Sequence, residues 1–280
     1  MRSEAWRLVV DGSADAAQNM AIDEAMLETY ERADPTTAPT LRIYGWSSPS
    51  YSLGRTQRGV ATGHVERILA RGFEVVRRPT GGDGVLHEHE RTYAVAGVVG
   101  SRDFPGGVVD TYARIARALV GAAVALGAAD ARTAAPERRV GREPSAVCFE
   151  RLSGCEVVSG GKKLVGSAQA RRRRAFLQHG SIPIRLGPER LAEAAGRSVD
   201  GGTFTDLARA SGREPSPAEV DRALVSAFEA EFSVRLVAAP LTPAETLRAA
   251  ELRAWRYDSL AWTLDGVWGE RERYWLGASA

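Results

Sequence analysis

The spacing of apolar residues along the chain predicts a series of helices. Between about Ala14 and Arg32 the apolar positions fall on one side of a helix: Met20, Met26, Leu27 and Tyr30. Residues 109–126 repeat this spacing and stop at Gly127, and residues 65–72 predict a shorter helix closing at Gly72. The sequences SPAE (216–219) and TPAE (242–245) are capping boxes with Pro at the first helical position, and the first opens a helix bearing Val220, Leu224 and Phe228.

Short apolar runs between these helices predict β-strands. The segments concerned are 6–12, 40–46, 73–78 and 92–100, together with several runs between 146 and 185. Apolar and polar residues alternate through 40–46, which predicts a strand buried on one face only. Strands and helices alternate unevenly, and this predicts an α+β fold with a central mixed or mainly antiparallel sheet flanked by helices.

Composition narrows the classes of protein that the chain can belong to. It has 280 residues, of which 44% are hydrophobic and 26% charged, with a net charge of +2. This is ordinary globular composition without a global field that would attract nucleic acid. No apolar run approaches the roughly 20 residues that cross a bilayer, and the first residues lack the apolar core of a signal peptide. We therefore expect a cytoplasmic protein with reduced thiols and no membrane or nucleic-acid partner.

The glycine-rich stretch RRPTGGDG is the first candidate for binding chemistry. Gly81, Gly82 and Gly84 leave main-chain N–H groups accessible to a ligand carbonyl or anion. Arg77 and Arg78 alternate faces of the preceding strand, so only one of them can point at a ligand. A simple hairpin turn is an equally good interpretation. The spacing of a dinucleotide-binding motif is absent.

The following HEHE sequence suggests a metal site, but only weakly. His87 and His89 would face the same side if both lay in one strand. The pattern is not the zinc-protease helix motif, and no third ligand stands nearby in the sequence. We expect no metal, and we expect His87 to form hydrogen bonds that are either structural or orient the substrate.

The stretch GGKKLVGSAQ combines two lysines with a backbone that carries little side-chain bulk. It is not a phosphate-binding loop, because Lys163 stands where Ser or Thr is required. In a strand, Lys163 and Ser167 share one face, whereas Lys162 and Gly166 share the other. One lysine therefore points inward and one outward, although a solvated surface is the usual place for either.

Cysteine and arginine residues supply two further candidates. Cys148 lies in the apolar stretch SAVCFE and Cys155 in SGCEV; inert packing is the ordinary role of such thiols. A lysine ammonium close to Cys148 would favour its nucleophilic thiolate form. The run RRRR at 171–174 predicts either an exposed loop or a basic patch that docks an acidic protein.

Taken in order, several of these motifs resemble the biotin/lipoate protein ligase superfamily. The matching pieces extend over about residues 19–184: NMAIDEAM, LRIYGW, RRPTGG with VLH and TY, GKKLVGSAQ, and LQHGSI. The resemblance implies a catalytic domain of this superfamily over residues 1–240, with a helical C-terminal extension, 241–280, packed on it. It also implies a tunnel for a lipoyl or octanoyl chain.

The resemblance carries residue roles with it. Lys163 matches the superfamily's lysine, and the small residues after it would let an acyl chain lie against the strand. The implied substrate-binding set is Arg78, Gly81, Gly82, His87, Gly166, Ser167, Ala168, His179 and Gly180. Asp83, after the paired glycines, and Arg91, before the TY sequence, depart from the superfamily's pattern.

Two chemistries occur within the superfamily. Lipoate ligases activate a free acid with ATP and Mg²⁺, whereas octanoyltransferases take the chain from acyl carrier protein and pass it through an enzyme cysteine. Cys148 resembles the nucleophile of the second type, which implies transfer to a lipoyl-domain protein such as glycine cleavage H protein without a cofactor. The alternatives are an ATP-dependent lipoate ligase and a non-catalytic lipoyl-binding protein.

Overall fold

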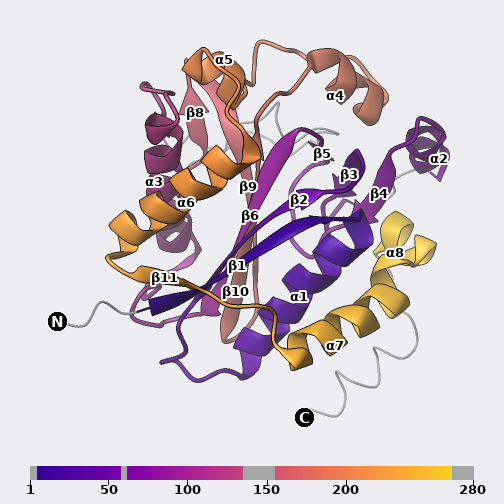
Figure 1. The fold of residues 1–280 in the computed structure, drawn as a ribbon. Helices are drawn as coiled ribbons and strands as arrows, with labels where there is room; N and C mark the ends of the chain where they lie inside the picture. Colours follow the sequence, from indigo (N-terminus) through magenta and orange to yellow (C-terminus); the bar gives the residue numbers. More distant parts are fainter. Residues whose placement is uncertain (1–4, 58–61, 135–154, 267–280) are drawn as a thin grey trace.

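The computed structural model describes residues 5–57, 62–134 and 155–266, and these form two β-sheets with helices packed around them (Figure 1). The strands are β1 (Ala5–Ala14), β2 (Thr40–Trp46), β3 (Ser50–Leu53), β4 (Glu74–Arg77), β5 (Val85–His87), β6 (Glu90–Val98), β7 (Arg132–Thr133), β8 (Val157–Ser159), β9 (Lys162–Arg171), β10 (Ala175–Pro183) and β11 (Arg235–Ala238). The helices are α1 (Ala16–Arg32), α2 (Thr62–Ala70), α3 (Val108–Ala125), α4 (Pro188–Ala195), α5 (Leu207–Ser211), α6 (Pro217–Phe232), α7 (Pro243–Leu252) and α8 (Leu260–Asp265).

The larger sheet is mixed. Its eight strands follow the order β11-β1-β2-β6-β10-β9-β8-β7. β1 runs parallel to both β2 and β11, and the other neighbours pair antiparallel. A smaller sheet has the order β4-β3-β5, with β3 parallel to β4 and antiparallel to β5. The predicted α+β class with a mixed central sheet flanked by helices is confirmed.

Helices cover both faces of the larger sheet, as Figure 1 shows. On one face, α3 and α6 pack against alternate residues of the central strands, such as Ile43 and Val95. On the other face, α1 and α7 pack against the intervening residues, such as Ala94 and Ala96. The small sheet forms its own core with α2 and α4. Because successive side chains of a strand point to opposite faces, the large sheet has one apolar layer under α3 and α6 and another under α1 and α7.

The helix boundaries follow from local signals in the sequence. The side chains of Ser216 and Thr242 each accept a hydrogen bond from the backbone N–H of the glutamate three residues later. The carboxylate of that glutamate accepts a hydrogen bond from the backbone N–H of the capping residue, so both predicted capping boxes are confirmed. Gly72 and Gly127 close α2 and α3 with positive φ angles of 81° and 107°. The short elements α4, α5 and β11 carry no comparable periodic signal and were not predicted.

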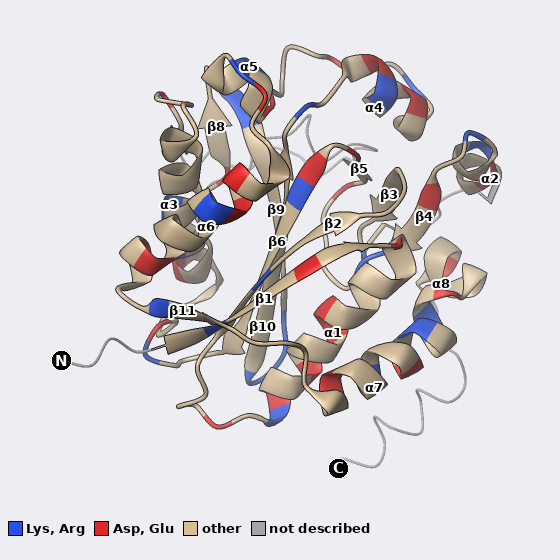
Figure 2. Ribbon diagram, viewed as in Figure 1, with Lys and Arg blue, Asp and Glu red and all other residues tan. Residues whose placement is uncertain are grey.

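One expectation about exposure is wrong. Strand β2 is not half-buried, because α1 covers the face on which Arg42 and Tyr44 lie, and both are fully buried. Within the run 171–174, Arg173 and Arg174 are exposed as a loop would be, whereas Arg171 bonds to Thr111 and Arg172 forms ion pairs with carboxylates of α1; docking of an acidic protein there stays a prediction. Figure 2 shows basic and acidic residues interspersed along the helices in this view.

Residues near the C-terminal end of the described chain belong to the same packed body. α7 packs against α1, and Glu245 at its start forms a buried ion pair with Arg7 of β1. A π-helical turn, Arg253–Tyr257, connects α7 to α8. The domain boundary placed at residue 240 stays a prediction. None of the helices in the described ranges is long and apolar enough to span a bilayer.

Candidate active site

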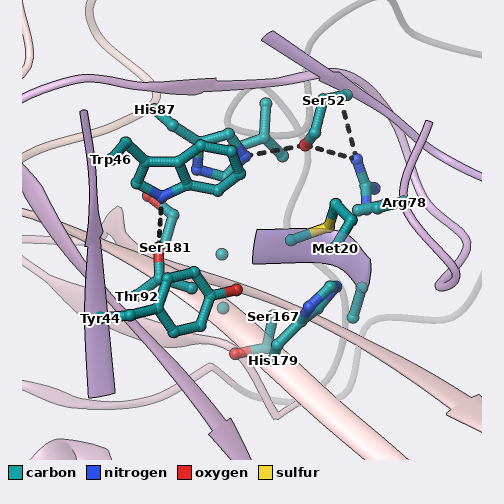
Figure 3. A pocket seen from close by; sticks show the side chains of 14 residues that line it. Met20, Tyr44, Trp46, Ser52, Arg78, His87, Thr92, Ser167, His179 and Ser181 are labelled. Atoms are coloured by element: carbon teal, nitrogen blue, oxygen red, sulfur yellow. Dashed lines mark hydrogen bonds between the residues drawn. The ribbon is translucent and has the colours of Figure 1, made fainter. Parts of the chain in front are cut away.

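A pocket that is open to solvent lies between the α1-covered face of the large sheet and the small sheet (Figure 3), with about 350 Å³ of empty space when its open part is included. It is lined by Met20, Tyr44, Trp46, Ser52, Arg78, Val85, His87, Thr92, Gly166, Ser167, Ala168, His179, Gly180 and Ser181. Seven of these fourteen residues belong to the substrate-binding set expected from the sequence. The pocket therefore brings together β2, β3, β5, β6, β9 and β10 with the start of α1.

One wall of the pocket is made by β9 and β10, where side chains are small. Gly166 lies opposite Ser181 and Ala168 opposite His179 in the antiparallel pairing, so each pair shares a face. Packing requires a glycine at position 180, because a Cβ atom there would lie 2.5 Å from the Gly166 carbonyl oxygen and 2.7 Å from a ring carbon of Tyr93. The two backbones therefore approach more closely than any side chain would permit.

Ser167 contributes to the pocket lining, but its hydroxyl is engaged elsewhere. Its Oγ lies 2.8 Å from the phenol oxygen of Tyr93, which also accepts a bond from Gln178. Burial raises the pKa of Tyr93 to about 12, although these two hydrogen bonds act in the opposite direction. Tyr93 is therefore a neutral structural group at physiological pH.

A buried network centred on Asp23 of α1 supports the pocket from below. Asp23 accepts hydrogen bonds from Arg42 Nη1 at 2.7 Å, from Tyr44 at 2.8 Å and from His179 Nδ1 at 2.7 Å. The other imidazole nitrogen, Nε2, lies 2.6 Å from Thr80 Oγ1. Because a carboxylate only accepts, Nδ1 carries the proton and the Thr80 hydroxyl donates to Nε2.

Electrostatics in this network favour ionised Asp23 beside neutral His179. Burial raises the pKa of Asp23, but the hydrogen bond from His179 and the charge of Arg42 outweigh it, so that this pKa lies below its ordinary value. Burial lowers the pKa of His179, against the opposing influence of Asp23. Burial and the Asp23 charge raise the pKa of Tyr44 well above its ordinary value.

His87 stands on the opposite wall and is held on three sides. Its Nε2 lies 2.8 Å from Ser52 Oγ, and its Nδ1 lies 2.9 Å from Glu90 Oε1. The indole of Trp46 stacks on the imidazole with ring centroids 3.9 Å apart and an interplanar angle of 15°. Figure 3 shows the three side chains of Trp46, His87 and Ser52 side by side at the rim.

The two neighbouring arginines have different surroundings, as their alternation predicted. Arg78 lines the pocket and donates to the carbonyl oxygens of Ser52, Gly81 and Asp83. Arg77 turns away toward α8. Gly81 and Gly82 lie in the loop held by Arg78 and are not among the residues that line the pocket. Gly82 has a φ of 92°, a conformation that favours glycine.

The two lysines of β9 take opposite sides of the strand, as predicted. Lys162 is exposed, whereas Lys163 is 1% exposed and its ammonium lies 2.5 Å from Glu156 Oε1. Lys163 does not line the pocket. Cys148 lies outside the described residues. Cys155 is a partly buried free thiol in the turn before β8, with a positive φ of 75°.

The HEHE sequence does not form one strand. β5 ends at His87, and His89 adopts a left-handed conformation with a φ of 48°, so the two imidazoles do not alternate along a common strand. Within the described ranges, no group of three or more His, Cys, Asp or Glu side chains gathers as a metal site.

Several residues of the site were not anticipated from the sequence. Glu156 pairs with Lys163 across the β8–β9 hairpin, Glu90 orients His87, and Asp23 orients His179. The signal for Asp23 was present, because a carboxylate within the apolar face of a helix requires buried partners. The signal for Glu156 was weak, since the hairpin register pairs Val158 with Lys163, and Glu156 reaches the ammonium from the position just before β8.

Fold and pocket together define a catalytic domain of the lipoate ligase type. The profile of the lipoyl protein ligase A/B catalytic domain matches residues 15–229. The chain belongs to this family, which confirms the resemblance seen in its motifs.

Relatives and solved structures agree with this assignment. A protein named Octanoyltransferase LipM from Kyrpidia tusciae is 39% identical over 265 residues, covering 90% of this chain and 96% of its own. Octanoyltransferase LipM from Moorella thermoacetica is 38% identical, covering 94% and 98%. A bi-partite lipoate protein ligase of Thermoplasma acidophilum, solved with its E2 lipoyl domain, matches with a TM-score of 0.70, 20% identity and coverage of 95% and 99%. The latter likeness concerns the fold alone.

Proposed function

We propose that the protein is an octanoyltransferase of lipoate biosynthesis. It takes an octanoyl chain from acyl carrier protein, holds it as a thioester on Cys148 and passes it to a lysine of a lipoyl-domain protein such as glycine cleavage H protein. The observation that carries this proposal is the pocket wall at Gly166 and Ala168, whose small side chains leave room for a thin acyl chain in a relative of Octanoyltransferase LipM proteins.

The proposed chemistry needs no nucleotide or metal. A thioester already stores the free energy for transfer, so the enzyme must supply a thiolate and donors for the developing oxyanion. We assign the thiolate to Cys148 and its electrostatic partner to Lys163. The buried Lys163–Glu156 pair supports this role by fixing the ammonium at one place in the hairpin.

A transfer assay separates this proposal from the ATP-dependent ligase. The enzyme is incubated with an apo lipoyl domain and either octanoyl-acyl carrier protein without nucleotide, or free octanoate with ATP and Mg²⁺. We expect octanoylation of the acceptor only in the first mixture. Transfer that occurs only in the second mixture would identify a ligase, and tight octanoate binding with no transfer in either would identify a non-catalytic protein.

A further inference from the structure

A hydroxyl–imidazole–carboxylate chain crosses one wall of the pocket, and Figure 3 shows its hydroxyl and imidazole, those of Ser52 and His87. Ser52 Oγ lies 2.8 Å from His87 Nε2, and His87 Nδ1 lies 2.9 Å from Glu90 Oε1. Ser52 and His87 line the pocket, whereas Glu90 lies behind them. All three residues are at most 8% exposed. These distances lie within the range that connects a general base to its proton donor and its orienting group.

The surrounding hydrogen bonds decide where the protons of this chain lie. Glu90 also accepts from the hydroxyls of Thr92 and Ser181, so its oxygens act as acceptors and His87 Nδ1 carries a proton. Arg78 Nη1 lies 3.3 Å from Ser52 Oγ and donates to it. The hydroxyl proton of Ser52 therefore points to the lone pair of His87 Nε2. The Ser52 hydroxyl thus connects this nitrogen to the pocket.

The environment of His87 also accommodates a positive charge on the ring. Glu90 faces one ring nitrogen, and the indole face of Trp46 stacks at 3.9 Å, which favours a cation. Arg78, behind Ser52, and His179, across the pocket, are the other charged or titratable groups that face this site, and positive charge on either opposes protonation. Glu90 contacts the ring nitrogen directly at 2.9 Å, and Arg78 contacts the Ser52 hydroxyl next to the ring at 3.3 Å.

Aminolysis of an acyl thioester by a lysine ammonium must dispose of one proton. The ammonium and the thioester give an amide, a thiol and one released H⁺, so the C–S bond breaks as the C–N bond forms. Lys163 is assigned as the ammonium beside the Cys148 sulfur and is paired with Glu156, so it already carries its proton and does not accept this one. A base on the pocket wall is required for the transfer step.

We propose that His87 is the general base of the transfer step. The acceptor amine gives its proton to Ser52 Oγ while the Ser52 hydroxyl proton passes to His87 Nε2, and Glu90 positions the ring. This inference rests on the proposed octanoyl transfer. It assigns His87 no part in loading the enzyme, because thiolate attack on the donor thioester releases no net proton.

The test separates loading from transfer. Octanoyl-enzyme is prepared from octanoyl-acyl carrier protein, isolated, and mixed with apo lipoyl domain in a single-turnover experiment across pH 5.5–9. We expect His87→Gln to load within about threefold of the wild-type rate and to transfer about 10²- to 10⁴-fold more slowly, the usual contribution of a general base. Added imidazole should restore part of the transfer rate. His89→Asn is the matched control, because His89 is exposed and Asn tolerates its left-handed backbone.

Each outcome decides the assignment. Ser52→Ala keeps the imidazole and should slow transfer alone, which protects the test against a His87 variant that fails to fold. Wild-type transfer rates in His87→Gln and Ser52→Ala, or equal losses in loading and transfer, would overturn the base assignment while leaving octanoyl transfer intact. A wild-type enzyme that never loads would overturn the proposed function and this inference together.

Discussion

At the scale of single residues, Gly180 determines how closely β10 can approach β9. A methyl group there would collide with the Gly166 carbonyl oxygen and with Tyr93, and neither can withdraw without disturbing the sheet. The requirement is for space alone, since Gly180 has no positive φ.

We predict that Gly180→Ala is destabilising by about 1–3 kcal/mol, as is typical of overpacking, and that it reduces octanoate binding several-fold by pushing β9 into the pocket. Chemical denaturation and calorimetric titration with octanoate measure the two effects. Gly12→Ala is the control, because a Cβ atom there meets nothing within 4 Å. Equal stability of both variants would refute the close approach.

His179 makes a second prediction at the residue scale. Burial lowers its pKa in the folded state, whereas an unfolded chain binds the proton near pH 6.5. The unfolded state then binds more protons below that pH, so the stabilisation is complete above about pH 6.5 and is lost as pH falls toward the folded pKa. Asp23 contributes in the same direction, but only at lower pH, because its pKa is also below the ordinary value.

We predict that the free energy of unfolding falls between pH 7.5 and 5.5, and that His179→Gln reduces this dependence although it lowers stability at pH 7.5. Urea denaturation at both pH values provides the measurement, with His89→Asn as the control that retains the wild-type dependence. An unchanged pH dependence in His179→Gln would show that another group carries it.

At the scale of elements, Arg77 connects the small sheet to α8. Its guanidinium donates to the carbonyl oxygens of Gly54 and Gln57 on one side and to those of Trp262, Thr263 and Leu264 on the other. The indole N–H of Trp262 donates a hydrogen bond to the Arg77 carbonyl oxygen. Because the α8 oxygens are those of a helix C-terminus, the cation also interacts favourably with the helix dipole.

We predict that Arg77→Met accelerates amide hydrogen exchange in α8 and around residues 54–57, and lowers stability by about 3 kcal/mol or more, since buried carbonyls lose charged donors. Exchange within α3 should remain unchanged apart from the global loss. Arg117→Met is the control. The Arg117 side chain is 56% exposed, so its ion pair with Glu231 contributes little to stability. Protection of α8 equal to that of the control would contradict the connection.

The comparison between sequence and structure also belongs to the element scale. Long helices and their capping boxes were predictable because local spacing and Ser216 or Thr242 specify them without distant contacts. The burial of β2 was not, because alternating Arg42 and Tyr44 look solvent-facing until α1 supplies Asp23 as their partner. The partners of His179 were not predictable either, because Asp23 and Thr80 lie far from it in the chain, whereas Glu90 is only three residues from His87.

At the scale of the whole molecule, the large sheet separates a structural face from a functional one. The α3–α6 face is packed with apolar side chains around Ile43 and Val95, whereas the α1 face opens into the pocket where the small sheet meets it. Half of the pocket-lining residues were expected from motifs, because the superfamily's motifs mark β9, β10 and the glycine-rich loop. The rest, such as Met20 and Ser52, are placed by the packing of the small sheet on the large one.

The account depends most directly on a covalent octanoyl-enzyme formed on one sulfur. The decisive measurement is the intact mass of the protein after incubation with octanoyl-acyl carrier protein in the absence of nucleotide. We predict the mass increment of one octanoyl group on the wild type and on Cys155→Ser, and none on Cys148→Ser. An unmodified wild type, or an increment that persists in Cys148→Ser, would contradict the account.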